Sequence, residues 1–376
     1  MEKGRNMIGL VAKNARAQSL FRLLCDREAR FVDLGVAKAG SIAKVMSLGS
    51  SIRAGIHRTR MDSHFSPFQS WGLQRSCERL LARHMDISTV LYWGATDRPT
   101  RKLPYFIISD GPFDPKDSTY PEEWVPKRWS KSYLARQRRV YREAEHVFTL
   151  SQWAADKIRD VHNVPSENVS VIGWGPLHAC VVPTLAPANG DYFVSVGSGW
   201  SCKGMDVLAA AAEYVHRSHP SGSVVLVGDP RGFEVRPRPG LRLIPHTVSG
   251  EEAQELISNA RALLVGSRFD ASPHVIMEAF QAGTPVIASR VCGIPEVVTK
   301  DMGYLVDSGD AEGFACAMRS CLEEDVTLQR TRVYQRYHQA LGGWERVAQR
   351  VASKISEATG SPISEYENWE VQCAQS

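Results

Sequence analysis

The stretch Leu263–Val298, LLVGSRFDASPHVIMEAFQAGTPVIASRVCGIPEVV, decides the fold that we expect for this chain. An apolar run at 262–265 has the length and the flanking residues of a strand buried on both faces of a parallel sheet. A polar loop, 266–273, follows, and residues 275–281 have helical character up to a glycine at a C-cap position. A second β-branched run, 286–288, ends in another loop. Strand, loop, helix and strand in this order predict a βαβ unit.

Ligands of such units bind outside the carboxyl ends of the strands, where helix N-termini present free N–H groups. The loop 267–274 is therefore the expected place for a phosphorylated ligand. Asp270 lies in this loop and Glu278 lies on the following helix, so two carboxylates could accept hydrogen bonds from the hydroxyl groups of a sugar or ribose. Spacing alone leaves a structural alternative open, in which Glu278 caps a surface helix or forms a salt bridge on it, and Asp270 is an N-cap.

The same stretch resembles the donor-site signature of retaining GT-B glycosyltransferases of family 4. The positions in register are Gly266-Ser267, Asp270, Glu278-Ala279, Gly283, Pro285-Val286-Ile287-Ala288, Gly293 and Pro295-Glu296. Asp270 stands where the family usually has its first Glu, and Gly266 where it usually has Pro. The resemblance implies that Glu278 holds the ribose hydroxyls and that Asp270, with the backbone of 271–274, orients the donor sugar.

A second phosphate cradle is expected after the predicted strand 192–197, where a glycine turn and Lys203 precede a predicted helix, 207–216. A surface lysine before a helix is the plain alternative. This segment resembles the family's Val-Gly-Arg-x-x-x-x-Lys-Gly-x-Asp, which implies that Lys203 contacts the donor diphosphate. Ser198 replaces the family's Arg, and Arg268 is the candidate substitute.

The expected donor-binding residues are Gly197, Ser198, Lys203, Ser267, Arg268, Ala271, Ser272, Pro273, His274 and Glu278. The expected catalytic residues are Asp110, Asp270 and Glu278. No spacing of His, Cys and Asp resembles a metal site, so none is predicted. We also expect no cofactor, because cationic side chains and helix N-termini can stabilise a diphosphate leaving group without a divalent metal.

The first hundred residues are harder to interpret. Helical spacing over 74–84 and strands at 30–35, 88–94 and 105–108 predict a second doubly wound sheet. Asp110 follows the last of these strands and could accept a proton from an acceptor hydroxyl, although Asp before Gly-Pro is also a common turn residue. In the resembled family the loop often begins with His, and Ser109 holds that position here.

The resemblance implies an α/β protein of GT-B fold, with two Rossmann-like doubly wound domains facing one cleft. We expect an acceptor-side domain over 1–185 and a donor-binding domain over 186–342, joined by the Pro/Ala/Gly stretch 183–190. Gly343-Trp344-Glu345 resembles the start of the family's closing helix, so 343–376 should be a return helix, which crosses back to the first domain, and a tail.

Composition limits the class of partner. The formal net charge of +4 over 376 residues does not favour nucleic acid. The basic stretch 127–142 could contact a phosphorylated acceptor or an anionic membrane surface, or be a solvated helix face. The eight cysteines lack CxxC spacing and read as free thiols of a reducing compartment. With no apolar stretch of about 20 residues and no signal-peptide pattern, we expect a cytoplasmic protein, with peripheral membrane contact through 127–142 if that stretch binds lipid.

The predicted reaction is transfer of a sugar, with retention, from a nucleotide-diphosphate sugar to an acceptor hydroxyl on a glycan, lipid or small molecule. Two alternatives remain. One is a GT-B epimerase or phosphorylase. The other is a degenerate GT-B protein that binds nucleotide-sugar as a subunit, a reading suggested by Ser198, Asp270 and Ser109 at positions where the family has Arg, Glu and His.

Overall fold

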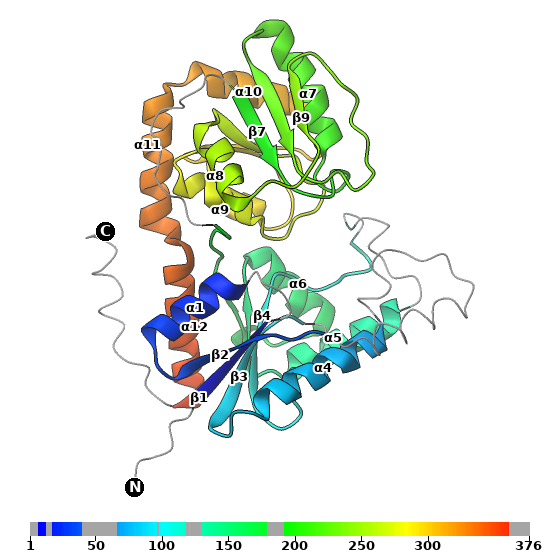
Figure 1. The fold of residues 1–376 in the computed structure, drawn as a ribbon, viewed down its shortest axis with the longest axis vertical. Helices are drawn as coiled ribbons and strands as arrows, with labels where there is room; N and C mark the ends of the chain where they lie inside the picture. Colours follow the sequence, from blue (N-terminus) through cyan, green and yellow to red (C-terminus); the bar gives the residue numbers. More distant parts are fainter. Residues whose placement is uncertain are drawn as a thin grey trace. The chain divides into compact units, whose positions relative to one another are not determined.

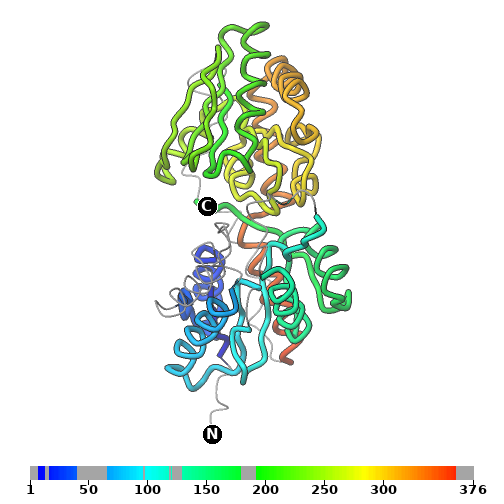
Figure 2. Tube along the Cα trace, turned by 90° about the vertical axis from the view of Figure 1, so that its right-hand side faces the viewer, coloured from blue at the N-terminus to red at the C-terminus, as the bar shows by residue number. Residues whose placement is uncertain are grey.

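The computed structural model shows two compact units, drawn in Figures 1 and 2. The first comprises 1–173 and 344–376, and the second comprises 174–343. The residues that the structure describes are 7–12, 17–39, 66–95, 98–117, 120, 129–178 and 192–360. The predicted domain boundary at 185/186 and the linker 183–190 lie outside the described residues. Each unit is built on its own parallel sheet, as the sequence predicted.

The first unit has a six-stranded parallel sheet in the order β2-β1-β3-β4-β5-β6. Its strands are β1 (Met7–Ala12), β2 (Phe31–Val36), β3 (Ile87–Trp93), β4 (Tyr105–Ser109), β5 (His146–Thr149) and β6 (Val169–Val171). Its helices are α1 (Gln18–Arg27), α4 (Pro67–Leu81), α5 (Ser130–Glu143), α6 (Gln152–His162) and α12 (Gly343–Thr359), with a short 3₁₀ turn η3 (Ser166–Asn168). The predicted helix 74–84 begins earlier, since Ser66 caps the amides of Phe68 and Gln69.

The predicted return helix is confirmed as α12, which belongs to the first unit although it follows the second in sequence. In Figure 2 its red trace runs among the blue and cyan segments of that unit. Trp344 packs edge-on against Trp93 at the end of β3, with ring centroids 5.8 Å apart. Arg350 donates a hydrogen bond to the carbonyl oxygen of Ile172 at 3.0 Å. α12 is therefore bound to the first unit at two places, the end of β3 and the residue that follows β6.

The second unit has a six-stranded parallel sheet in the order β12-β11-β10-β7-β8-β9. Its strands are β7 (Tyr192–Val196), β8 (Ser223–Val227), β9 (Leu241–Ile244), β10 (Ala262–Val265), β11 (Val286–Ser289) and β12 (Gly303–Val306). Its helical segments are α7 (Met205–Ser218), α8 (Gly250–Asn259), α9 (His274–Gln281), η4 (Ile294–Glu296), α10 (Ala311–Glu323), α11 (Val326–Arg336) and η5 (Tyr337–Leu341). The predicted βαβ unit is confirmed as β10-α9-β11, whose strands pair in parallel with Leu263 opposite Val286.

The strand order of the second unit sets the position of its site. β7, the first strand of this sheet in sequence, lies beside β10, the fourth, and the strands that follow each of them extend in opposite directions across the sheet. A ligand of this unit is therefore expected at the carboxyl edge, by the loops that follow β7 and β10. Both strands are fully buried over most of their length, as expected for central strands of a parallel sheet.

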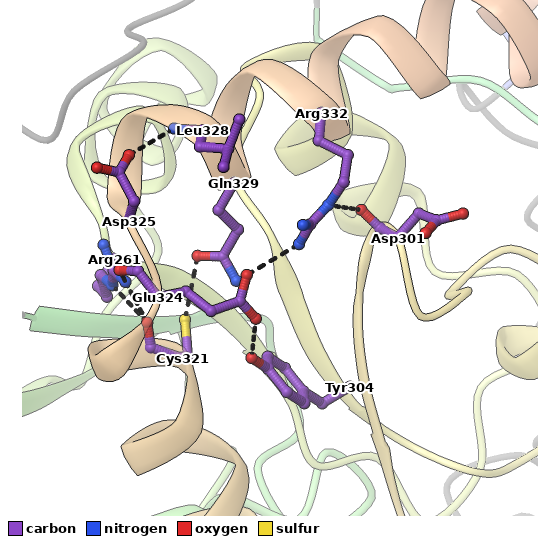
Figure 3. Close-up of polar contacts among 9 residues, drawn as sticks. All are labelled: Arg261, Asp301, Tyr304, Cys321, Glu324, Asp325, Leu328, Gln329 and Arg332. Carbon is purple, nitrogen blue, oxygen red and sulfur yellow. Dashed lines mark hydrogen bonds and ion pairs between the residues drawn. The ribbon is translucent and has the colours of Figure 1, made fainter.

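The opposite, amino edge of this sheet is tied to the corner between α10 and α11 (Figure 3). Arg261, just before β10, donates hydrogen bonds to the carbonyl oxygens of Cys321 and Glu324. The Glu324 carboxylate accepts hydrogen bonds from Tyr304 of β12 and from Arg332. This network holds the helices of the unit in place at the edge away from the candidate site.

Candidate functional site

Two loops meet at the carboxyl edge of the second sheet: 197–204 after β7 and 266–273 after β10. Gly204 adopts φ +62°, and a Cβ atom placed there would lie 2.0 Å from the carbonyl oxygen of Gly266. The backbone N–H of Arg268 donates to the carbonyl oxygen of Cys202 at 2.9 Å. The Cys202 thiol donates in turn to the carbonyl oxygen of Phe269 at 3.3 Å. The two loops thus form one rigid rim, which only glycine at position 204 permits.

Lys203 and Asp270 form an ion pair across this rim, from Nζ to Oδ2. Both side chains are largely covered, with relative exposures of 30% and 14%. The aliphatic part of Lys203 lies over Gly197, 3.6 Å from where a Cβ atom would be. Ser267 Oγ donates to the same carboxylate oxygen at 3.4 Å. The structure therefore brings together the lysine and the carboxylate that the sequence assigned to diphosphate and sugar.

The side chain of Arg268 forms hydrogen bonds with residues at the start of α7 and just before it. Its guanidinium contacts the carboxylate of Asp206 at 2.6 and 2.9 Å and the carbonyl oxygen of Ser201 at 2.6 Å. The hydrogen bond to Asp206 raises the pKa of Arg268, so the side chain stays cationic. Its charge is compensated by Asp206, and its role as the substitute for the family's Arg stays a prediction. Ser198 lies half-buried in the loop 197–204.

Glu278 is buried on α9, with 5% of its surface exposed. Burial raises the pKa of its carboxyl group, against the opposing effects of His178 and of the backbone amides of His178 and Leu177. The His178 amide donates to Oε1 at 3.2 Å. Glu278 is therefore not a salt-bridged residue of a surface helix, and that alternative was wrong. The N-cap alternative for Asp270 was also wrong, because Pro273 occupies the N-cap position of α9.

The segment Trp174–His178, which lies outside the predicted site, runs along the start of α9 and is called the strap below. Trp174 Nε1 donates to the carbonyl oxygen of Pro273 at 3.4 Å, and His274 Nδ1 lies 2.7 Å from the carbonyl oxygen of Gly175. Gln254 of α8 donates to the carbonyl oxygen of His178 at 3.5 Å. The sequence signal for the strap was slight, a Gly-Pro pair after an aromatic residue.

The remaining predicted donor-site residues lie on the same rim. Ser272 and His274 are buried, and Ala271 is partly exposed. α9 begins at His274, so the amides of its first turn lie at the end of the 266–273 loop. The backbone amides at a helix N-terminus, together with the Lys203 ammonium group, suit an anionic group such as a diphosphate.

Asp110 belongs to the first unit and follows β4 at the carboxyl edge of that sheet. Ser109 is buried beneath it, 2.8 Å from the hydroxyl oxygen of Tyr141, so Ser109 does not present its side chain to a ligand. The loop after Asp110 is held in place by Gln137, which accepts a hydrogen bond from the amide of Phe113 at 3.1 Å. The carboxylate of Asp110 is thus a partly exposed group on a fixed turn.

In the part of the chain that the structure describes, no group of three or more His, Cys, Asp and Glu side chains is arranged to hold a metal ion. No helix among the described residues is both long enough and apolar enough to cross a membrane.

Residues 190–324 match the family model described as glycosyl transferases group 1. Within the described part of the chain, this match falls on the second unit. The match spans all of the β7–α10 segment, and so includes Lys203, Asp270 and Glu278.

Curated relatives match about half of the chain. The chain is 26% identical over 219 residues to glycogen synthase of Mycobacterium tuberculosis (strain CDC 1551 / Oshkosh), covering 55% of this chain and 52% of that protein. It is 31% identical over 186 residues to D-inositol 3-phosphate glycosyltransferase of Corynebacterium diphtheriae, covering 46% of this chain and 44% of that protein. The chain therefore spans about half the length of these relatives.

Solved structures match nearly the whole chain. Sucrose-phosphate synthase from Thermosynechococcus elongatus has a TM-score of 0.67 at 16% identity, over 95% of this chain and 100% of that one. Anabaena HepE in complex with UDP-glucose has a TM-score of 0.63 at 15% identity, over 93% and 100%. At such identities the likeness shows the fold alone, and the fold is GT-B.

Proposed function

We propose that this protein is a retaining glycosyltransferase that moves a sugar from a nucleotide-diphosphate sugar to an acceptor hydroxyl. The observation that carries the proposal is the meeting of Lys203 and Asp270 at the switch point of the second sheet, with Glu278 on the helix that follows. The relatives named as glycosyltransferases and the neighbour solved with UDP-glucose support it. The domain boundary at 185/186 is part of the same proposal.

Each group has a defined task in this reaction. The Lys203 ammonium group and the first-turn amides of α9 neutralise the diphosphate, whose negative charge grows as the bond to the sugar breaks. Asp270 exchanges its ion pair with Lys203 for the hydroxyl groups of the donor sugar, which the backbone of 271–274 helps to orient. Glu278 accepts hydrogen bonds from the ribose, and Asp110 receives the acceptor proton.

Neither a metal nor a cofactor is required by this chemistry. A lysine and a helix N-terminus supply the positive potential that a divalent ion would otherwise provide. The spacing of the eight cysteines in the sequence suits a reducing compartment, so we place the reaction in the cytosol.

The first test is a thermal-shift panel of UDP, GDP, ADP and their common sugar conjugates. A ligand at 100 times its Kd adds about 2.7 kcal/mol to the stability of the state that binds it. For a unit of this size that corresponds to a rise in Tm of roughly 5–10 °C. The nucleotide series that stabilises the protein then serves as donor in a transfer assay, with product anomers determined by NMR.

Two variants test the assigned roles. Lys203→Met removes the cation and should weaken binding of the nucleoside diphosphate by roughly 10- to 100-fold, because a hydrogen bond to a charged group contributes about 1.5–3 kcal/mol. Glu278→Gln keeps the shape of the side chain and should weaken binding of the nucleoside as well. Lys300→Met and Glu255→Gln, at exposed positions, are the matched controls.

The outcomes separate the alternatives. Binding without turnover, in the presence of diverse acceptors, would favour the degenerate binding subunit. Turnover without acceptor would indicate an epimerase, and turnover that needs inorganic phosphate would indicate a phosphorylase. If none of the nucleotides binds, the proposed function is wrong.

A further inference from the structure

Three segments of the first unit pack, together with α6, on one face of its sheet: α4, the β3–β4 crossover at 98–103, and α5. Their apolar side chains enter a single core with alternate residues of the strands. The contributing residues are Leu73, Cys77 and Leu81 from α4, Leu103 from the crossover, and Val140, Tyr141 and Ala144 from α5 and its C-cap. Figure 1 shows α4 and α5 on the same side of the unit. Their outer sides therefore belong to one surface.

The crossover is bonded to the helices on both sides. Arg101 Nε donates to Gln74 of α4 at 3.4 Å, and Arg98 pairs with Glu143 of α5 at 2.8 Å. These contacts fix the three segments against one another. Their joint outer surface, formed by 67–83, 98–104 and 130–143, is called the basic face below.

The basic face concentrates positive charge. Its segments contain eleven Lys and Arg but only two Glu, whereas the formal net charge of the whole chain is +4. The rest of the chain is therefore net acidic. One of the two glutamates, Glu143, is already paired with Arg98 and Arg139. The exposed cations are Arg75, Arg79, Arg83, Arg101, Lys102, Lys131, Arg138, Arg139 and Arg142.

An exposed tryptophan lies in line with these cations. Trp71, Arg75, Arg79 and Arg83 are spaced by four residues, so they follow one another along one side of α4 and its C-terminal end. Trp71 is 42% exposed, and the Arg75 guanidinium lies 4.9 Å from its ring centroid. Met85, at the same end as Arg83, is 95% exposed. An amphipathic ring beside arginines suits the boundary between lipid headgroups and acyl chains.

We propose that the basic face docks this protein on the surface of an anionic lipid bilayer. The arginines and lysines meet the headgroup phosphates, while Trp71 and Met85 enter the boundary region. The surface extends the membrane contact expected from 127–142, since it includes α4 and the crossover. Charge alone would also suit nucleic acid, but the exposed Trp71 and Met85 favour a bilayer. The proposal does not depend on the proposed sugar transfer.

The test is flotation of the full chain with lipid vesicles at physiological ionic strength. Vesicles in which roughly one lipid in three is phosphatidylglycerol are compared with vesicles of phosphatidylcholine alone. The variant Arg75→Gln/Arg79→Gln/Arg101→Gln removes three charges. Each basic residue near an anionic surface contributes about a fivefold change in partitioning, so the loss should be roughly 100-fold. Trp71→Ala should weaken partitioning several-fold on its own, by removing buried ring area.

A matched control removes the same charge from the second unit. Arg236→Gln/Arg242→Gln/Lys300→Gln alters exposed cations and should change vesicle binding by no more than a few-fold. Circular dichroism and thermal melting confirm that each variant is folded.

Three results would overturn the proposal. The first is equal binding to neutral and anionic vesicles, and the second is equal loss in the two triple variants. The third is tight binding to duplex DNA that displaces vesicles and is insensitive to Trp71→Ala, which would identify nucleic acid as the partner.

Discussion

Gly204→Ala should disrupt the rim that joins the two loops of the candidate site. Position 204 has φ +62°, and the added Cβ atom would lie 2.0 Å from the carbonyl oxygen and 2.9 Å from the carbonyl carbon of Gly266. The left-handed backbone costs about 1–2 kcal/mol for alanine, and displacing a packed backbone costs a further ~1–3 kcal/mol. We expect the free energy of unfolding of the second unit to fall by about 3 kcal/mol or more.

The matched control is Gly232→Ala. Gly232 has φ +81°, but among the described residues, apart from its two chain neighbours, no atom lies within 4 Å of its added Cβ atom. This variant isolates the cost of placing alanine in a left-handed backbone, and its free energy of unfolding should fall by about 1 kcal/mol. Urea unfolding measures both variants, with nucleotide binding as a second readout. If Gly204→Ala loses no more stability than Gly232→Ala, or keeps full nucleotide affinity, the close approach of the two loops does not shape the site.

Two further predictions concern stability. Arg330 is fully buried and donates to three carbonyl oxygens at the C-terminal ends of α8 and α9. Arg330→Met should therefore lower the free energy of unfolding by about 3–5 kcal/mol in urea unfolding. The control Arg332→Met, at a half-exposed position, should lower it by about 1 kcal/mol or less. Equal losses of stability in the Arg330→Met and Arg332→Met variants would contradict a structural role for the hydrogen bonds of Arg330. Burial lowers the pKa of His146 and of His162 to about 4. Between about pH 6.5 and pH 4 these two imidazoles are therefore neutral in the native state, whereas in the unfolded chain they take up protons near pH 6.5. Stability of the first unit should therefore be full above about pH 6.5 and fall as the pH drops to about 4, by up to ~3 kcal/mol per histidine. His162→Phe should flatten the profile measured by urea unfolding at each pH, and an unchanged profile would exclude that histidine as a cause.

The donor-site helix could be predicted from sequence because its signal is local. An apolar run, a polar loop and a helical period identify β10-α9-β11 without knowledge of any distant residue. By contrast, the sequence alone does not predict β1, because MIGLVA is a short apolar run beside charged residues. Its place in the sheet depends on pairing with both β2 and β3, whose residues come later in the chain.

The sequence by itself determined the fold class of the second unit and the chemistry available to its site, since Lys203, Asp270 and Glu278 are fixed by the motifs that contain them. Only the tertiary structure decided which of them meet. Lys203 and Asp270 are 67 positions apart, and the amide of His178 reaches Glu278 from 100 positions away. Burial of Glu278, and with it the raised pKa of that carboxyl group, comes from elements packed against α9. Local periodicity depends on neighbours in the chain, whereas ion pairing and desolvation depend on neighbours in space.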